Sequence, residues 1–127
     1  MSIAAQEMKD RVNDPFRVLF CIGVGASYFE ASKAEREQVL DALRSGFDDL
    51  DGRFGITVLG TMDDDRFRLV PSSGWPWTAY ILADVPGVDT AIAVLNIIRE
   101  TAIGEGTLSR YIYLEARVGR RLFFGNS

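Results

Sequence analysis

The pattern of apolar and polar positions predicts a chain of alternating strands and helices. The first strand should span residues 17–25 (RVLFCIGVG), which are rich in Val, Ile and Phe and contain no breaker before the glycines. Because both faces of this stretch are apolar, we expect a central strand. Further strands are expected at residues 55–62 and 75–85, and the alternation at residues 66–70 would extend the second strand as a hairpin.

Two segments between these strands have helical spacing. Residues 32–35 (SKAE) form a capping-box pattern, in which Ser32 caps the helix and Glu35 reaches back to the first turn. Apolar side chains then recur every three or four residues to about residue 50, and we expect the helix to end near Gly52. Asp89 is a suitable cap for a second helix, which should end before residue 104.

Residues 110–118 (RYIYLEARV) predict a last strand with two different faces. Its even positions are apolar, and its odd positions are aromatic or charged: Tyr111, Tyr113, Glu115 and Arg117. The complete order is β-α-β-β-α-β, which predicts an α+β, ferredoxin-like fold with a four-stranded antiparallel sheet and both helices on one face.

Helices on one face leave the other face of the sheet uncovered. Aromatic side chains expected on that face, such as Tyr111, Tyr113 and Trp77, are costly to leave in water. We therefore expect a homodimer whose two sheets face each other and enclose a cavity, as in a dimeric α/β barrel. Residues 1–15 should form an N-terminal tail or arm, and residues 16–127 one domain.

Composition narrows the possible partners. The 127 residues are 47% hydrophobic, which allows a packed core, and the net charge of −4 argues against nucleic acid, which needs clustered cations. No apolar run reaches the ~20 residues that span a bilayer, and the first residues lack a secretory pattern. The single cysteine, Cys21, excludes an intramolecular disulfide, so we expect a cytoplasmic protein without a membrane partner.

The chain contains no histidine, which removes the commonest general base, metal ligand and haem ligand. Gly23 and Gly25 lack the third glycine of a dinucleotide fingerprint. Cys21 has no partner base and is more typical of a small buried hydrophobe than of a nucleophile. We therefore expect neither a metal nor an organic cofactor.

An acidic turn follows the second strand. Asp63, Asp64 and Asp65 repel one another unless they are solvated, paired or metal-bound. They form either a solvated turn with one Asp capping backbone amides, or a loop fixed over a pocket by pairing with Arg66 or Arg68.

The aromatic residues leave alternatives open. Trp75 and Trp77 have the same strand parity, so both rings should lie on one face. They either pack in the core or across a dimer contact, or form a stacking platform for a planar ligand. The odd face of the last strand is likewise a dimer or solvent surface, or a pocket wall in which Glu115 would act as a general base. Tyr28 follows the first strand in a loop that would face the ligand.

The element order, the length and the aromatic open face resemble the dimeric α/β-barrel proteins, which include cofactor-independent monooxygenases and muconolactone-type isomerases. Within that superfamily the phrases MDDDR (62–66), GWPWTAYILADVP (74–86) and EARVGR (115–120) are similar to those of small accessory proteins from bacterial indole-3-acetic acid degradation clusters. The resemblance implies that the protein binds or converts an indole-derived intermediate. The absence of histidine departs from many members, so carboxylate or tyrosine chemistry, or binding alone, would replace a histidine mechanism.

On this hypothesis the protein is a cofactor-independent enzyme, or an enzyme accessory, for a small aromatic compound. The ring would be held by four aromatic side chains: Trp75, Trp77, Tyr111 and Tyr113. Arg66 or Arg117 would pair with a substrate carboxylate. A proton would be moved by one of four carboxylates: Glu115, Asp63, Asp64 or Asp65. The alternative is a non-catalytic ligand-binding or assembly protein whose aromatic face is only a dimer interface.

Overall fold

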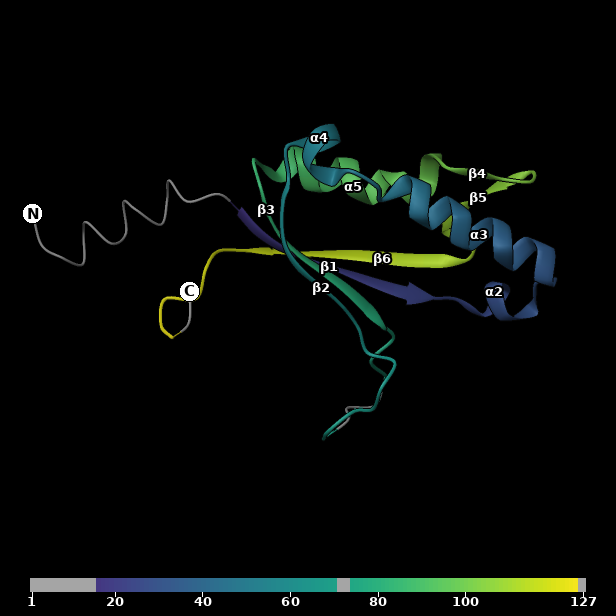
Figure 1. The fold of residues 1–127 in the computed structure, drawn as a ribbon, viewed down its shortest axis with the longest axis horizontal. Helices are drawn as coiled ribbons and strands as arrows, with labels where there is room; N and C mark the ends of the chain where they lie inside the picture. The colour runs from purple at the N-terminus through teal and green to yellow at the C-terminus, as the bar shows by residue number, and fades with distance from the viewer. Residues whose placement is uncertain (1–15, 71–73, 126–127) are drawn as a thin grey trace, which may run out of the picture.

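A computed structural model describes residues 16–70 and 74–125, and the arm expected at residues 1–15 lies outside the described residues. The main sheet has the order β2-β3-β1-β6, and all neighbouring strands are antiparallel. Its strands are β1 (Phe16–Val24), β2 (Thr57–Asp63), β3 (Ala79–Val85) and β6 (Ile112–Gly119). Two longer helices, α3 (Lys33–Gly46) and α5 (Val88–Glu100), cover one face of the sheet (Figure 1). This is the ferredoxin-like α+β fold that the element order predicts.

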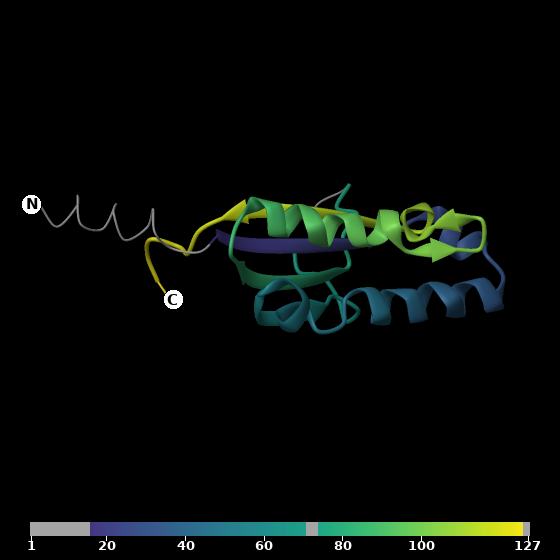
Figure 2. The same ribbon diagram turned by 90° about the horizontal axis from the view of Figure 1, so that it is seen from above.

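Short elements complete the fold. They are α2 (Ala26–Glu30), α4 (Leu50–Phe54), the two-stranded ladder of β4 (Ala102–Ile103) and β5 (Gly106–Thr107), and the 3₁₀ turn η1 (Leu108–Arg110). Seen from above, the axes of α3 and α5 both run along the length of the sheet (Figure 2). None of the helices in residues 16–70 and 74–125 is long and apolar enough to cross a bilayer.

The single helix expected from residue 32 to about 50 is wrong at its end, because α3 stops at Gly46 and the separate helix α4 begins at Leu50. The start is confirmed, since the Ser32 side chain accepts a hydrogen bond from the Glu35 amide at 3.1 Å. At the other end Asp49 adopts a left-handed conformation with a φ of 47°, which interrupts the helix and caps α4. Arg53 Nη1 donates to the Gly46 and Asp48 carbonyls at 2.7 and 2.8 Å, which satisfies acceptors at the end of α3.

Three other expected boundaries also change. Residues 66–70 are not a strand, and Val70 there has a left-handed φ of 49°, which does not fit a ladder. β3 begins only at Ala79, so both tryptophans precede it. The cap of α5 is Gly87 rather than Asp89, and Asp89 instead lies in the first turn, where its charge is favourable.

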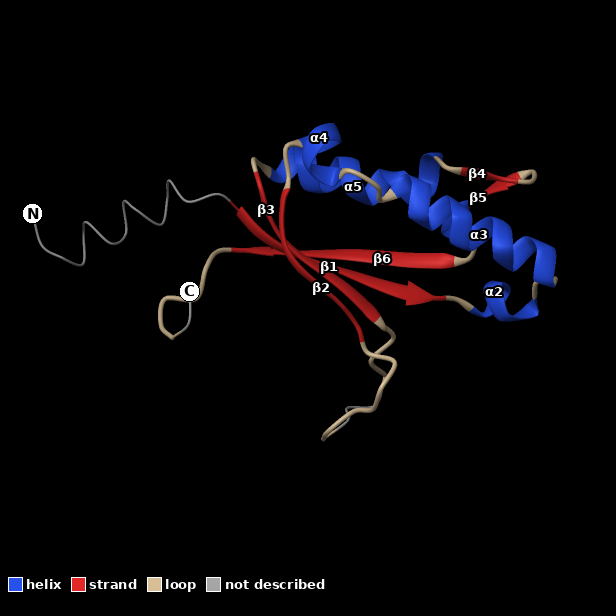
Figure 3. Ribbon diagram, in the orientation of Figure 1, coloured by secondary structure: helices blue, strands red, loops and turns tan. Residues whose placement is uncertain are grey.

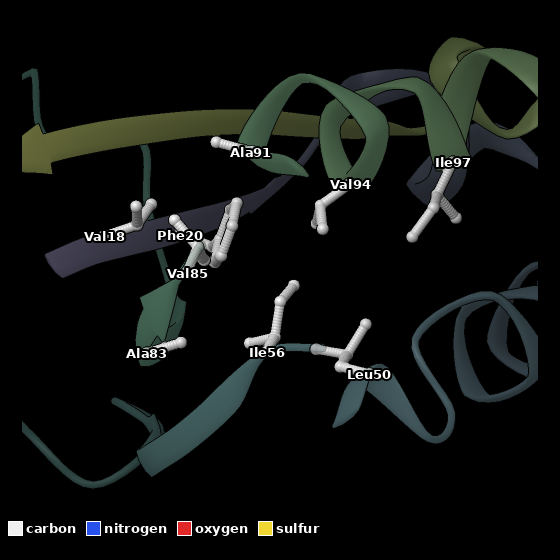
Figure 4. Packing of buried hydrophobic residues seen from close by; sticks show 9 residues of the cluster. All are labelled: Val18, Phe20, Leu50, Ile56, Ala83, Val85, Ala91, Val94 and Ile97. Carbon is white, nitrogen blue, oxygen red and sulfur yellow. The ribbon is translucent and has the colours of Figure 1, made fainter. Parts of the chain in front are cut away.

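The core lies between the sheet and the helices. Its main cluster, hereafter the main core, joins β1 and β3 to α5 and to the segment around α4 (Figure 4), and its members are Val18, Phe20, Leu50, Ile56, Ala83, Val85, Ala91, Val94 and Ile97. A second cluster lies under α3 and η1 and comprises Val39, Ile98, Ile103, Leu108, Tyr111 and Ile112. Even-numbered β1 residues thus face the helices, and the odd-numbered ones belong to the uncovered face, hereafter the open face.

The strand β2 forms one edge of the sheet and is exposed along its whole length. Its pairing with β3 is interrupted between Val58 and Gly60, where Leu59 is an extra residue in the ladder. This bulge brings Gly60 opposite Leu82, so that both positions belong to the open face.

Candidate functional site

The strand register places a mixed apolar and polar set of side chains on the open face. In one row, Leu19 lies between Leu82 of β3 and Arg117 of β6. In the next row, Cys21 lies between Tyr80 and Glu115. The register across the sheet cannot be read from the alternation of one strand, so these neighbours were not predicted.

The segment from Trp75 to Trp77 lies against this face. An added Cβ at Gly23 would come within 2.8 Å of the Pro76 carbonyl oxygen and 3.2 Å of the Trp77 ring, so the segment lies directly on β1. The Arg117 guanidinium lies 4.9 Å from the centroid of the Trp75 ring. Both tryptophans therefore share the open face with β6, although they come before β3 rather than within it.

Tyr80 links this segment to the acidic turn. Its hydroxyl accepts a hydrogen bond from Trp75 Nε1 at 2.7 Å. The same hydroxyl lies 3.2 Å from Asp64 Oδ2 and 3.2 Å from the Trp77 carbonyl oxygen, and it donates its one proton to one of them. Asp64 is thus the member of the acidic triplet that joins the site, whereas Asp63 and Asp65 are exposed.

Two ion pairs lie on the open face. Arg117 Nε donates to Glu115 Oε2 at 3.1 Å. Arg17 holds Asp84 through two parallel bonds, from Nε at 2.9 Å and from Nη2 at 3.2 Å. The exposed Arg117–Glu115 pair contributes about 0–1 kcal/mol to stability, so its main effect is to fix the orientation of the two side chains.

Cys21 is fully buried beneath this set of side chains. Burial raises the pKa of the Cys21 thiol above its ordinary value; Arg117 opposes this shift and Glu115 adds to it. The protonated thiol is a poor nucleophile, which agrees with its interpretation as a small buried hydrophobe.

An apolar hollow of about 400 Å³ lies on the open face beside Tyr80. It is lined by Leu19, Gly60, Thr61, Met62, Tyr80 and Leu82, and it is open to solvent. Its volume falls within the range of small-molecule sites, about 300–1,000 Å³. We call the hollow together with Trp75, Arg117 and Glu115 the candidate site.

Three predicted binding residues lie elsewhere. The expectation that Tyr111 shares a face with Tyr113 is wrong, because Tyr111 follows η1, before β6 begins, and is buried in the second core cluster. Strand parity therefore does not apply to it. Tyr28 lies in α2 and packs against the same cluster, and Arg66 is exposed in the loop after β2, which extends away from the helices (Figure 3).

Two glycines that sequence reasoning had considered only as a nucleotide motif shape the site instead. Gly23 leaves room for the tryptophan segment, and an added Cβ at Gly25 would lie 2.8 Å from the Tyr113 hydroxyl. Tyr113 itself is about half exposed at the edge of the face. The available signal was that these glycines interrupt an otherwise apolar strand.

Within the described ranges, no group of three or more Cys, Asp and Glu side chains is placed to hold a metal ion.

No family model matches the chain, and no curated protein matches it. A solved structure described as a dimeric protein of unknown function with a ferredoxin-like fold, from Bacteroides fragilis, is similar over 85% of this chain and 95% of that one. The TM-score is 0.41 and the sequence identity is 9%. A similarity at this level says nothing of function, which rests on the candidate site.

Proposed function

We propose that the protein binds a small, flat aromatic carboxylate of the indole type in the hollow on its open face. The observation that carries the proposal is the apolar hollow between Leu19, Leu82 and Tyr80, with Arg117 as the cross-strand neighbour of Leu19. Apolar walls with a few placed polar groups are typical of sites for small ligands.

Arg117 supplies the polar end of the proposed site. It is the cross-strand neighbour of Leu19, which lines the hollow. Its Nε is bonded to Glu115, while its two Nη groups make no hydrogen bond to any residue in the described ranges. A guanidinium with free Nη groups pairs well with a carboxylate. The position of Arg117 therefore favours an acid such as an indole-acetate over a neutral indole.

We further propose that a second copy covers the open face and closes the hollow. Apolar side chains remain exposed on and around this face, including Leu82, Met62 and Tyr113. The open face also carries positive and negative side chains, in the pairs Arg17–Asp84 and Arg117–Glu115. Such a face is suited to a symmetric contact with the same face of a second copy. The buried, free thiol of Cys21 supports placing this dimer in the reducing cytoplasm.

Calorimetric titration with indole-3-acetate tests the binding proposal. We expect saturable binding with a Kd below ~1 mM, which corresponds to a binding free energy of at least about 4 kcal/mol in magnitude. Leu82→Asn should weaken binding about tenfold, because it places an amide in the apolar wall. Leu40→Asn is a matched control, since Leu40 of α3 is 39% exposed and Leu82 is 38% exposed. Failure to saturate at millimolar ligand, or equal effects of the two variants, would contradict the proposal.

Sedimentation of the full chain tests the dimer. We expect twice the monomer mass at micromolar concentration, and the monomer mass for Leu19→Asp, which would bring two carboxylates into the apolar part of the contact. Leu40→Asp on the helix side should leave the mass unchanged. A wild-type monomer under these conditions would refute the second copy as the cover of the open face.

One observation favours the alternative of a dry interface without a ligand. The Trp75 indole already donates a hydrogen bond to Tyr80 and has the Arg117 guanidinium against its ring. These contacts within the chain take up part of the surface that a ligand would need. A dimer that binds no aromatic acid would support this alternative. The catalytic roles expected for Glu115, Asp63, Asp64 and Asp65 stay predictions.

A further inference from the structure

Gly60 occupies an unusual position in the wall of the hollow. It lies inside β2, opposite Leu82, where a glycine weakens a strand and packs no side chain. Glycine is usually required where φ is positive or where other atoms come close to the backbone. Gly60 is not among the residues with positive φ, and an added Cβ there would meet no heavy atom within 4 Å. Neither requirement applies within this chain.

The contrast with the other glycines of the site is clear. Gly23 and Gly25 each have a close neighbour from the same chain, at 2.8 Å in both cases. Gly60 has open space instead, and this space belongs to the hollow. A strand glycine marks either a bulge, such as the one at Leu59 beside it, or a place where a ligand or another backbone comes close. The open space above Gly60 favours the second reason.

We propose that Gly60 sets the size limit of the ligand, by leaving room for the second ring of a two-ring aromatic acid. This inference rests on the proposed function. The ring would lie between Gly60 on β2 and Leu82 on β3, with Leu19 completing the wall. A side chain at residue 60 would project from the same face as Leu82 and fill that space.

Titration of a substitution series with two probes tests the inference. For wild type we expect binding of both indole-3-acetate and the one-ring analogue phenylacetate. Gly60→Ala should weaken indole-3-acetate about tenfold and phenylacetate little, and Gly60→Val should abolish binding of indole-3-acetate but keep that of phenylacetate. Gly119→Val is the control, because an added Cβ at Gly119 of β6 also meets nothing within 4 Å.

The thermal midpoint shows whether the variants fold. Valine favours strands, and an added Cβ at residue 60 meets nothing within 4 Å, so the midpoint should not fall. Equal loss of both probes, or unchanged binding of indole-3-acetate by Gly60→Val, would overturn the size limit while leaving the proposed function intact. If wild type binds neither probe, both proposals fail together. If wild type binds neither probe but forms a dimer that Gly60→Val dissociates, the space beside Gly60 is filled by a second copy.

Discussion

Replacing Phe20 by alanine should lower the free energy of unfolding by about 3–5 kcal/mol. Phe20 is fully buried and is the largest fully buried side chain in the main core. It projects from β1 into the space between the sheet and α5, among Val18, Val85 and Val94 (Figure 4). Because the whole stability of a small domain is about 5–15 kcal/mol, this loss would be a large part of it.

Urea denaturation measures the loss. Phe29→Ala is a control of identical chemistry, because Phe29 lies in α2 and is 68% exposed. It should change the free energy of unfolding by no more than about 0.5 kcal/mol. Similar losses of unfolding free energy in the two variants would contradict the placement of Phe20 between the sheet and the helices.

Replacing Gly23 by valine should displace the tryptophan segment from the sheet and expose Cys21. The new Cβ would lie 2.8 Å from the Pro76 carbonyl oxygen, which is backbone and cannot rotate away. Forcing extra carbon into such a contact costs about 1–3 kcal/mol. Movement of the segment would let water reach the thiol, and loss of burial would lower the Cys21 pKa towards its ordinary value.

Thiol labelling with a disulfide reagent reports this change. The thiolate is the reactive form, and at a fixed pH its fraction rises as the thiol pKa falls. At pH 8, labelling of Gly23→Val should therefore be at least ten times faster than labelling of wild type. Tryptophan emission should shift to the red in parallel. Gly60→Val introduces the same side chain at a position where an added Cβ meets nothing within 4 Å, and it should leave labelling slow. An unchanged labelling rate for Gly23→Val would show that the segment does not cover Cys21.

Much of the fold follows from local patterns that the structure confirms. The apolar run of β1, the alternation of β6 and the cap at Ser32 correspond to observed elements, and their order leads to the sheet topology. The boundaries failed where a single backbone conformation decides them. The left-handed Asp49 divides the first helix, and nothing in the apolar spacing around it indicates such a break.

The site was predictable in its residue types but less so in its geometry. Trp75, Arg117 and Glu115 do come together on the open face, and Tyr111 does not. The reason is that parity arguments hold only inside a strand, and Tyr111 lies just before one. Tyr80 and Gly60 were missed because their importance depends on cross-strand register, which a single sequence does not contain.

The bulge at Leu59 has a consequence for how the molecule avoids unwanted association. An edge strand offers a row of free amides and carbonyls that any other extended chain can join, which leads to aggregation. In β2 that row is broken in the middle by the extra residue, so an incoming strand cannot stay in step along its length. Addition of a further strand at the β2 edge of the sheet is thereby discouraged.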